Sequence, residues 1–120
     1  MSFQRLQRVG GLLKQEISEI IRLKIKDPRL DFVTVTFVEV SQDLRHAKVY
    51  VCCPGSHEEL LKRVEILVNA AGFIRSELFK RVTLRFIPEL SFRADRSIDH
   101  GIKISQMLKE LEDESRRGES

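Results

Sequence analysis

Two runs of β-branched residues, joined by a short polar connection, constrain the fold of this chain more than any other feature of the sequence. The runs cover residues 33–40 and 45–51, and the connection holds Ser41, Gln42 and Asp43. Such runs favour extended strands, and a connection this short joins neighbouring strands that run in opposite directions. Apolar and polar residues alternate in the second run. The sequence therefore predicts an antiparallel hairpin with one packed face and one partly open face.

Helical patterns precede and follow the hairpin in the sequence, and the helices they predict can cover its packed face. Residues 3–25 carry apolar side chains at intervals of three and four, which is typical of one buried helical stripe. Asp27 and Pro28 end this helix, because the residue before a proline is pushed out of the helical region. After the hairpin, Ser56 and Glu59 form a capping-box pattern. A second helix is expected to begin there.

The second helical region contains Ala70, Ala71 and Gly72, which predict a break or kink followed by a third helix. Alternation over residues 82–87 predicts a third strand that ends at Pro88, and a last helix is expected over 97–111. The connection to the third strand passes through helices, so that strand can run parallel to a neighbour. The expected fold class is α+β, with a three-stranded mixed sheet and an additional C-terminal helix. We expect one domain over residues 1–114 and a flexible polar tail over 115–120.

The basic residues are clustered rather than spread evenly. The chain has 120 residues and a net charge of +3, a mild bias that favours an anionic partner only where the charge gathers. Residues 1–29 hold seven basic and three acidic side chains, and residues 72–96 hold six and three. The first helix and the segment after Gly72 are therefore the expected positive surfaces.

Several other function classes have little support in the sequence. A disulfide between the neighbouring Cys52 and Cys53 would be strained, and no signal peptide or membrane span is visible, so we expect reduced thiols in a cytoplasmic protein. His46, His57 and His100 have no partner at the spacing of a catalytic or zinc site. We expect no catalytic residues, no metal or other cofactor, no membrane partner and no small-molecule substrate.

The expected order of elements resembles the KH domain, in the type II variant that has its extra helix before the sheet. In KH domains a GXXG loop between two helices clamps a nucleic-acid backbone, and Ala70, Ala71 and Gly72 stand at that position here. From Arg5 to about Leu111 the sequence resembles the ribosome-binding factor A family. The pieces that carry this resemblance are Asp27-Pro28-Arg29, residues 33–51, AAGFIRSEL at 70–78 and RFIPELSFRADRSIDHG at 85–101.

The resemblance implies a factor for maturation of the small (30S) ribosomal subunit. Such a factor would bind small-subunit ribosomal RNA near its 5′ region, assist rRNA processing and folding, and contribute to cold adaptation. We expect it to act as a monomer. The alternative is a KH-like protein-interaction module whose basic face meets an acidic protein partner, and an unrecognised hydrolase is a third possibility.

The candidate RNA-binding residues centre on the predicted break. If Gly72 opened a helix, its backbone N–H groups could hold a phosphate, and Arg75 in the first turn could close on the same anion; a kink needed only for packing is the alternative. The further candidate cations are Lys80, Arg81, Arg85, Arg5, Arg8, Arg45 and Lys48. The other explanation for them is ordinary solvated charge or, for Lys80 and Arg81, favourable charge at a helix C-terminus.

Base stacking is not expected from the aromatic residues. Tyr50 is the only tyrosine, tryptophan is absent, and most of the seven phenylalanines fall at predicted core positions. Proteins that bind single strands usually offer exposed aromatic platforms. The sequence therefore predicts recognition of RNA shape and backbone rather than of stacked bases.

Overall fold

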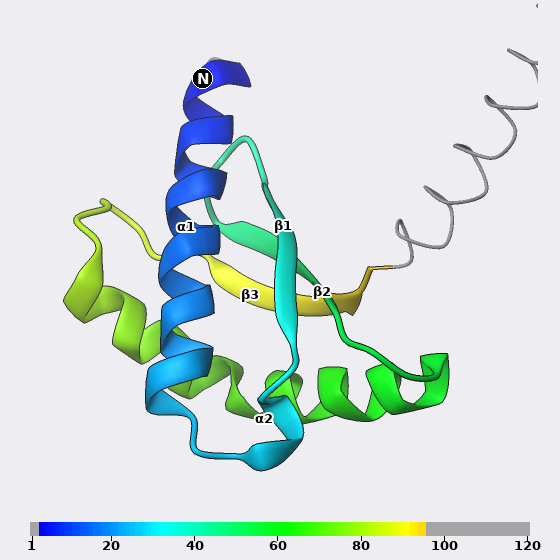
Figure 1. Cartoon of the computed structure of the whole chain (residues 1–120). Helices are drawn as coiled ribbons and strands as arrows, with labels where there is room; N and C mark the ends of the chain where they lie inside the picture. Colours follow the sequence, from blue (N-terminus) through cyan, green and yellow to red (C-terminus); the bar gives the residue numbers. More distant parts are fainter. Residues whose placement is uncertain (1–2, 96–120) are drawn as a thin grey trace, which may run out of the picture.

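The computed structural model describes residues 3–95, which form a three-stranded sheet with two long helices packed against it (Figure 1). The elements follow in the order α1 (Phe3–Lys24), the short 3-10 helix η1 (Pro28–Leu30), β1 (Thr34–Val40), β2 (His46–Cys52), α2 (His57–Arg81) and β3 (Glu89–Ala94). The α+β fold class is confirmed. The predicted C-terminal helix, the tail over 115–120 and Arg96 lie outside the described residues.

The sheet has the strand order β1-β2-β3. β1 and β2 pair in antiparallel fashion, and β2 and β3 pair in parallel. Both the predicted hairpin and the predicted mixed sheet are therefore confirmed. A register shift between Val35 and Phe37 marks a β-bulge in β1, and the Thr36 hydroxyl within it donates to the Tyr50 carbonyl oxygen and contacts the Asp95 carboxylate.

One face of the sheet forms the core together with both helices. Alternate strand residues such as Val49, Val51 and Phe92 are buried in one cluster with helix residues such as Leu13 and Leu67. In α1, a side chain at Gly10 would place its Cβ 2.7 Å from the carbonyl oxygen of Val38 in β1. Glycine therefore allows α1 to lie directly on the backbone of the sheet.

The third strand was predicted in the wrong place. Residues 82–87 form no strand; Val82 caps the end of α2, where its N–H donates to the Leu78 carbonyl oxygen at 3.0 Å. The strand is Glu89–Ala94, and Pro88 precedes it instead of ending it. The apolar alternation continues on both sides of Pro88, and only pairing with β2 decides which part joins the sheet. That pairing begins where the Glu89 N–H donates to the Arg45 carbonyl oxygen at 2.8 Å.

The predicted break at residues 70–72 is also absent. α2 begins at the expected cap, where the Ser56 hydroxyl accepts from the Glu59 N–H, and runs as one helix of 25 residues through Gly72. Figure 1 shows the axis of α2 changing direction along its length, so the helix bends without interruption. A Cβ at Gly72 would meet no atom within 4 Å. Neither helix in the described part of the chain is long and apolar enough to cross a membrane.

Candidate nucleic-acid interface

Arg75 connects α2 to the segment that follows it. Its Nε and Nη2 donate to the Ile87 carbonyl oxygen at 3.2 and 2.8 Å, and its guanidinium carbon lies 5.9 Å from the centre of the Phe79 ring. Because α2 continues through Gly72, no helix begins there. The predicted phosphate seat at a helix start is therefore wrong, and Arg75 can offer an anion only the donors that Ile87 leaves unused.

Arg81 and Lys80, which adjoin in sequence, have different environments. The Arg81 side chain is only 21% exposed, and its Nη1 lies 3.0 Å from Glu19 and 3.4 Å from Glu16, both on α1. Lys80 pairs with Glu77 at 3.4 Å, and the Lys80 side chain is 70% exposed whereas that of Glu77 is 13% exposed. Arg81 therefore joins the two helices, whereas Lys80 remains accessible to an anion.

Exposed aromatic rings accompany the arginines near the end of α2. The expectation that most phenylalanines are in the core is wrong: six of the seven are exposed, and Phe92 is the buried one. Arg85 lies in the loop between α2 and β3 rather than on a strand, with its guanidinium carbon 5.6 Å from the centre of the exposed Phe86 ring. We call Phe73, Arg75, Phe79, Arg85 and Phe86 the aromatic-basic surface.

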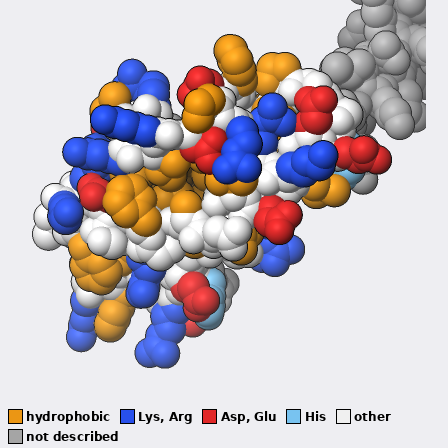
Figure 2. Space-filling model, turned by 90° about the horizontal axis from the view of Figure 1, so that it is seen from below, with side chains coloured by type: hydrophobic (Ala, Val, Ile, Leu, Met, Phe, Trp, Pro, Cys, Tyr) orange, Lys and Arg blue, Asp and Glu red, His pale blue; other side chains and the backbone are white. Residues whose placement is uncertain are grey.

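The aromatic-basic surface lies at one end of the molecule. On the left of Figure 2, which is the side of the C-terminal half of α2 in Figure 1, Lys and Arg side chains lie next to hydrophobic ones. Guanidinium groups over rings are favourable cation–π pairs, and both partners are also groups on which bases stack. This end of α2 therefore offers more than charge to a nucleic acid.

A groove of about 440 Å³ runs between α2 and β3. It is lined by Val68 and Ala71 of α2 and by residues of two strands. The strand residues include His46 and Lys48 of β2 and Glu89, Ser91 and Arg93 of β3. The predicted site residues Ala71 and Lys48 thus meet in one place. Arg93 was not among the predicted site residues, and correct placement of β3 is the signal that would have found it. Ala70, which precedes the groove residue Ala71 in the chain, is half-buried, and Gly72 is exposed.

The remaining predicted cations lie elsewhere. Arg5 and Arg8 are exposed in the first turns of α1, and Arg45 is exposed just before β2. Figure 1 shows the N-terminal turns of α1 and the β1–β2 turn together, at the end of α1 that lies away from α2. The Asp43 carboxylate accepts from the Arg45 N–H and from the Ser41 hydroxyl, and the Ser41 bond in particular lowers the pKa of Asp43. The predicted residues therefore form two groups rather than one surface.

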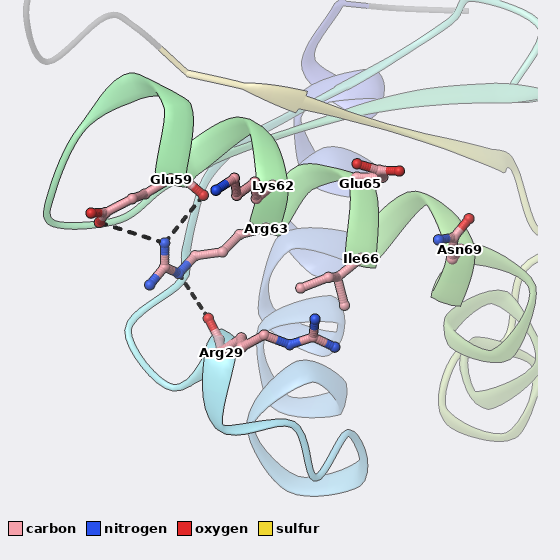
Figure 3. A pocket seen from close by; sticks show the side chains of 7 residues that line it. All are labelled: Arg29, Glu59, Lys62, Arg63, Glu65, Ile66 and Asn69. Carbon is pink, nitrogen blue, oxygen red and sulfur yellow. Dashed lines mark hydrogen bonds and ion pairs between the residues drawn. The ribbon is translucent and has the colours of Figure 1, made fainter.

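A second hollow, of about 650 Å³, lies between η1 and α2 (Figure 3). Arg63 bridges it, because its Nε donates to the Arg29 carbonyl oxygen at 2.8 Å and its Nη1 donates to the Glu59 carbonyl oxygen at 3.1 Å. The Arg29 guanidinium binds the Asp27 carboxylate, and these hydrogen bonds lower the pKa of Asp27. Glu59 and Glu65 also line the hollow. Its mixed charge gives an anion little advantage there.

The described residues contain little that suggests catalysis. Within residues 3–95, no three His, Cys, Asp or Glu side chains gather as they would around a metal ion. Cys52 and Cys53 are half-buried free thiols. Burial, followed by the nearby Asp95 and Cys53, raises the pKa of Cys52, which keeps its thiol protonated and weakly nucleophilic.

Comparison with known proteins agrees with the geometry. A family model described as ribosome-binding factor A matches residues 5–108. A ribosome-binding factor A of Desulfitobacterium hafniense is 48% identical over 119 residues, covering 99% of this chain and 95% of its own. Another, from Macrococcus caseolyticus, is 51% identical over 107 residues, covering 89% of this chain and 94% of its own.

Solved structures show the same relationship. The crystal structure of ribosome-binding factor A from Thermus thermophilus superposes with a TM-score of 0.66 at 29% identity, over 74% of this chain and 94% of that one. A Thermus thermophilus homology model of the same factor, fitted into a cryo-EM map of a 30S complex, gives a TM-score of 0.61 at 31% identity, over 72% of this chain and 91% of that one. The chain therefore belongs to the ribosome-binding factor A family.

Proposed function

We propose that this protein binds the small ribosomal subunit during its maturation in the cytoplasm. It contacts ribosomal RNA near the 5′ region and assists processing and folding of that RNA as a monomer without turnover. The observation that carries the proposal is family membership along nearly the whole chain, including a relative fitted into a 30S complex. A binding protein of this kind acts by preferring one RNA arrangement over another, because a ligand shifts an equilibrium only by its differential affinity.

The contact surface in this proposal combines the aromatic-basic surface with the groove between α2 and β3. Residues 72–81 carry three basic side chains and one acidic one. Lys48 and Arg93 line the groove, and neither has an ion-pair partner within the part of the chain that the structure describes. Cations without partners are the ones that can neutralise phosphates, with an affinity that falls as salt rises. Arg81, which α1 already engages, has a positioning role.

The test is co-sedimentation with precursor small subunits at several salt concentrations. A Lys48→Glu, Arg85→Glu double variant removes two such cations and should weaken binding by about ten-fold or more and flatten the salt dependence. Lys62→Glu is the matched control, because Lys62 is exposed on the N-terminal half of α2, outside the proposed surface. Equal sedimentation of the double variant and the wild type would contradict the proposed surface.

A second measurement separates RNA from protein as the partner. Purified small-subunit ribosomal RNA, free of protein, should bind the wild type in a salt-sensitive manner. Binding to intact subunits without binding to this RNA would favour the alternative function, in which the same surface meets an acidic protein.

A further inference from the structure

The open face of the sheet carries a row of two aromatic rings and one arginine. Phe37 of β1 pairs in register with Tyr50 of β2, and Tyr50 pairs with Arg93 of β3. Register partners lie side by side on the same face of a sheet. The ring centres of Phe37 and Tyr50 are 6.2 Å apart, with 33° between the ring planes, and Phe37 is 55% exposed. We call these three residues the open-face row.

The bulge in β1 is the reason that Phe37 faces outward. In a regular strand Phe37 would share the face of Val35, which is only 4% exposed. The register shift between Val35 and Phe37 moves Val38 and Val40 onto the buried face and turns Phe37 to the open one. Thr36 fixes this geometry through its hydroxyl, which donates to the Tyr50 carbonyl oxygen at 3.2 Å. The β-bulge thus exposes the Phe37 ring on the face of the sheet that does not pack against the core.

Charged side chains of both signs border the open-face row. Arg93 ends the row, and Lys48 precedes Tyr50 by two residues on the same face of β2. Glu39 lies opposite Lys48 in the next row, and Glu89 lies 3.8 Å from His46 one row farther along. On the side of the row opposite Lys48, the Asp95 carboxylate contacts the hydroxyl of Thr36, the residue before Phe37. Arg93 and Lys48 therefore lie next to the rings, as do the carboxylates of Glu39 and Asp95, whereas Glu89 lies one row farther away.

We propose that the open-face row binds unpaired bases of single-stranded RNA. Phe37 and Tyr50 supply the faces on which bases stack, while Arg93 and Lys48 meet the phosphates that connect those bases. Exposed rings on a sheet with cations beside them form the kind of platform that single strands use, and stacking of this type tolerates any base. The inference rests on the proposed function, because that function makes RNA the partner, and it adds a contact to single-stranded RNA on the open face of the sheet.

The only tyrosine of the chain, with no tryptophan present, gives a direct measurement at this site. Intrinsic fluorescence excited at the tyrosine band reports on Tyr50 alone in the full chain. Titration with a single-stranded oligouridylate of about eight nucleotides should quench it, because that length fits the site sizes of single-strand platforms. Phe37→Leu keeps an apolar side chain but removes the ring, and should weaken binding by about 5- to 100-fold.

Controls separate stacking from general electrostatic attraction. Phe32→Leu removes an exposed ring between η1 and β1, outside both proposed surfaces, and should leave the quenching curve unchanged. An RNA duplex presents no unstacked bases and should quench little at the same phosphate concentration. Circular dichroism establishes that both variants are folded. Tyr50→Phe retains the ring and should bind nearly as well as the wild type, and its binding is measured by the fluorescence anisotropy of a labelled oligonucleotide.

The outcomes also distinguish this inference from the proposed function. Absence of quenching by the single strand, or equal quenching by the duplex, overturns the inference even when co-sedimentation with subunits is normal. A second pair of results also overturns the inference. If the single strand does not quench Tyr50 fluorescence and Phe37→Leu nevertheless sediments poorly with subunits, the open-face row contacts a protein instead of RNA. Loss of co-sedimentation by Arg85→Glu alone, which leaves Lys48 in place, together with normal quenching of Tyr50 by the single strand, counts against no part of the open-face row and supports the aromatic-basic surface.

Discussion

The two long helices contribute to the fold in different ways. α1 has 22 residues and buries six of them, Val9, Gly10, Leu13, Ile17, Ile20 and Ile21. α2 has 25 residues and buries four, Leu60, Leu67, Ile74 and Leu78. Large apolar side chains of α2, including Val68, Phe73 and Phe79, are between 45% and 63% exposed. α1 also exposes apolar side chains, Phe3, Leu12 and Leu23, but it buries more of its residues than the longer α2 and is therefore fixed more closely to the rest of the fold.

Glycine shows the same difference between the helices. Gly10 of α1 lies against the backbone of β1, and Gly72 of α2 faces open space. The sequence drew attention to Gly72, because two alanines precede it and a KH loop is expected at that point. The closer packing requirement is at Gly10. A glycine inside a helical pattern thus has no fixed meaning until its neighbours in space are known.

The largest effect should come from Gly10→Ala. The added Cβ would lie 2.7 Å from the Val38 carbonyl oxygen, so α1 or β1 must move. Overpacking of this kind costs about 1–3 kcal/mol, more than the gain in helix propensity. Gly11→Ala is the matched control, since nothing lies within 4 Å of its Cβ, and should stabilise the protein by about 0.5–1 kcal/mol. Urea denaturation of both variants measures the two changes, and equal signs would contradict the close approach of α1.

Most of the fold could be predicted because hydrophobic spacing and local caps specify it. The first helix was expected over 3–25 and is Phe3–Lys24, and the hairpin strands differ from expectation by one residue at their ends. Ser56 caps α2 as expected. The third strand was misplaced because residues 82–87 and Glu89–Ala94 both alternate, and a contact with β2 that is distant in sequence selects between them. Local patterns carry no information about that choice.

A middle-sized effect should come from Arg81→Ala, which tests whether the connection between the helices matters. Removing the guanidinium takes the ion-pair partner away from Glu16 and Glu19. The loss matters most at Glu16, because its side chain is only 18% exposed to water. The free energy of unfolding should fall by about 1 kcal/mol. Lys80→Ala removes a neighbouring side chain that is itself 70% exposed and has one ion-pair partner, Glu77, and should change it by less than about 0.5 kcal/mol. Similar losses from both variants in thermal denaturation would show that Arg81 is an ordinary surface charge.

The candidate site was predictable only in part, because a list of basic residues does not show which ones already have partners. Arg75 and Arg81 were chosen for their charge, yet both are engaged by the protein. Arg93 was passed over because its strand was misplaced. The exposed phenylalanines were assigned to predicted core positions. The β-bulge that exposes Phe37 has one trace in the sequence, which is the change of phase in the alternation at the adjacent apolar residues Phe37 and Val38.

The smallest effect should come from Gly72→Ala, which tests whether the backbone at residues 70–72 takes part in binding. Gly72 has no positive φ angle and no neighbour that a methyl group would meet, so alanine fits its conformation. Alanine in place of glycine inside a helix should raise the free energy of unfolding by about 0.5–1 kcal/mol. Binding to small subunits should stay unchanged, because side chains, and not the backbone at Gly72, provide the proposed contacts. A stable variant that binds poorly would show that the backbone at residues 70–72 belongs to the interface, as the KH resemblance first implied. The backbone of α2, and not only its side chains, would then contact the RNA.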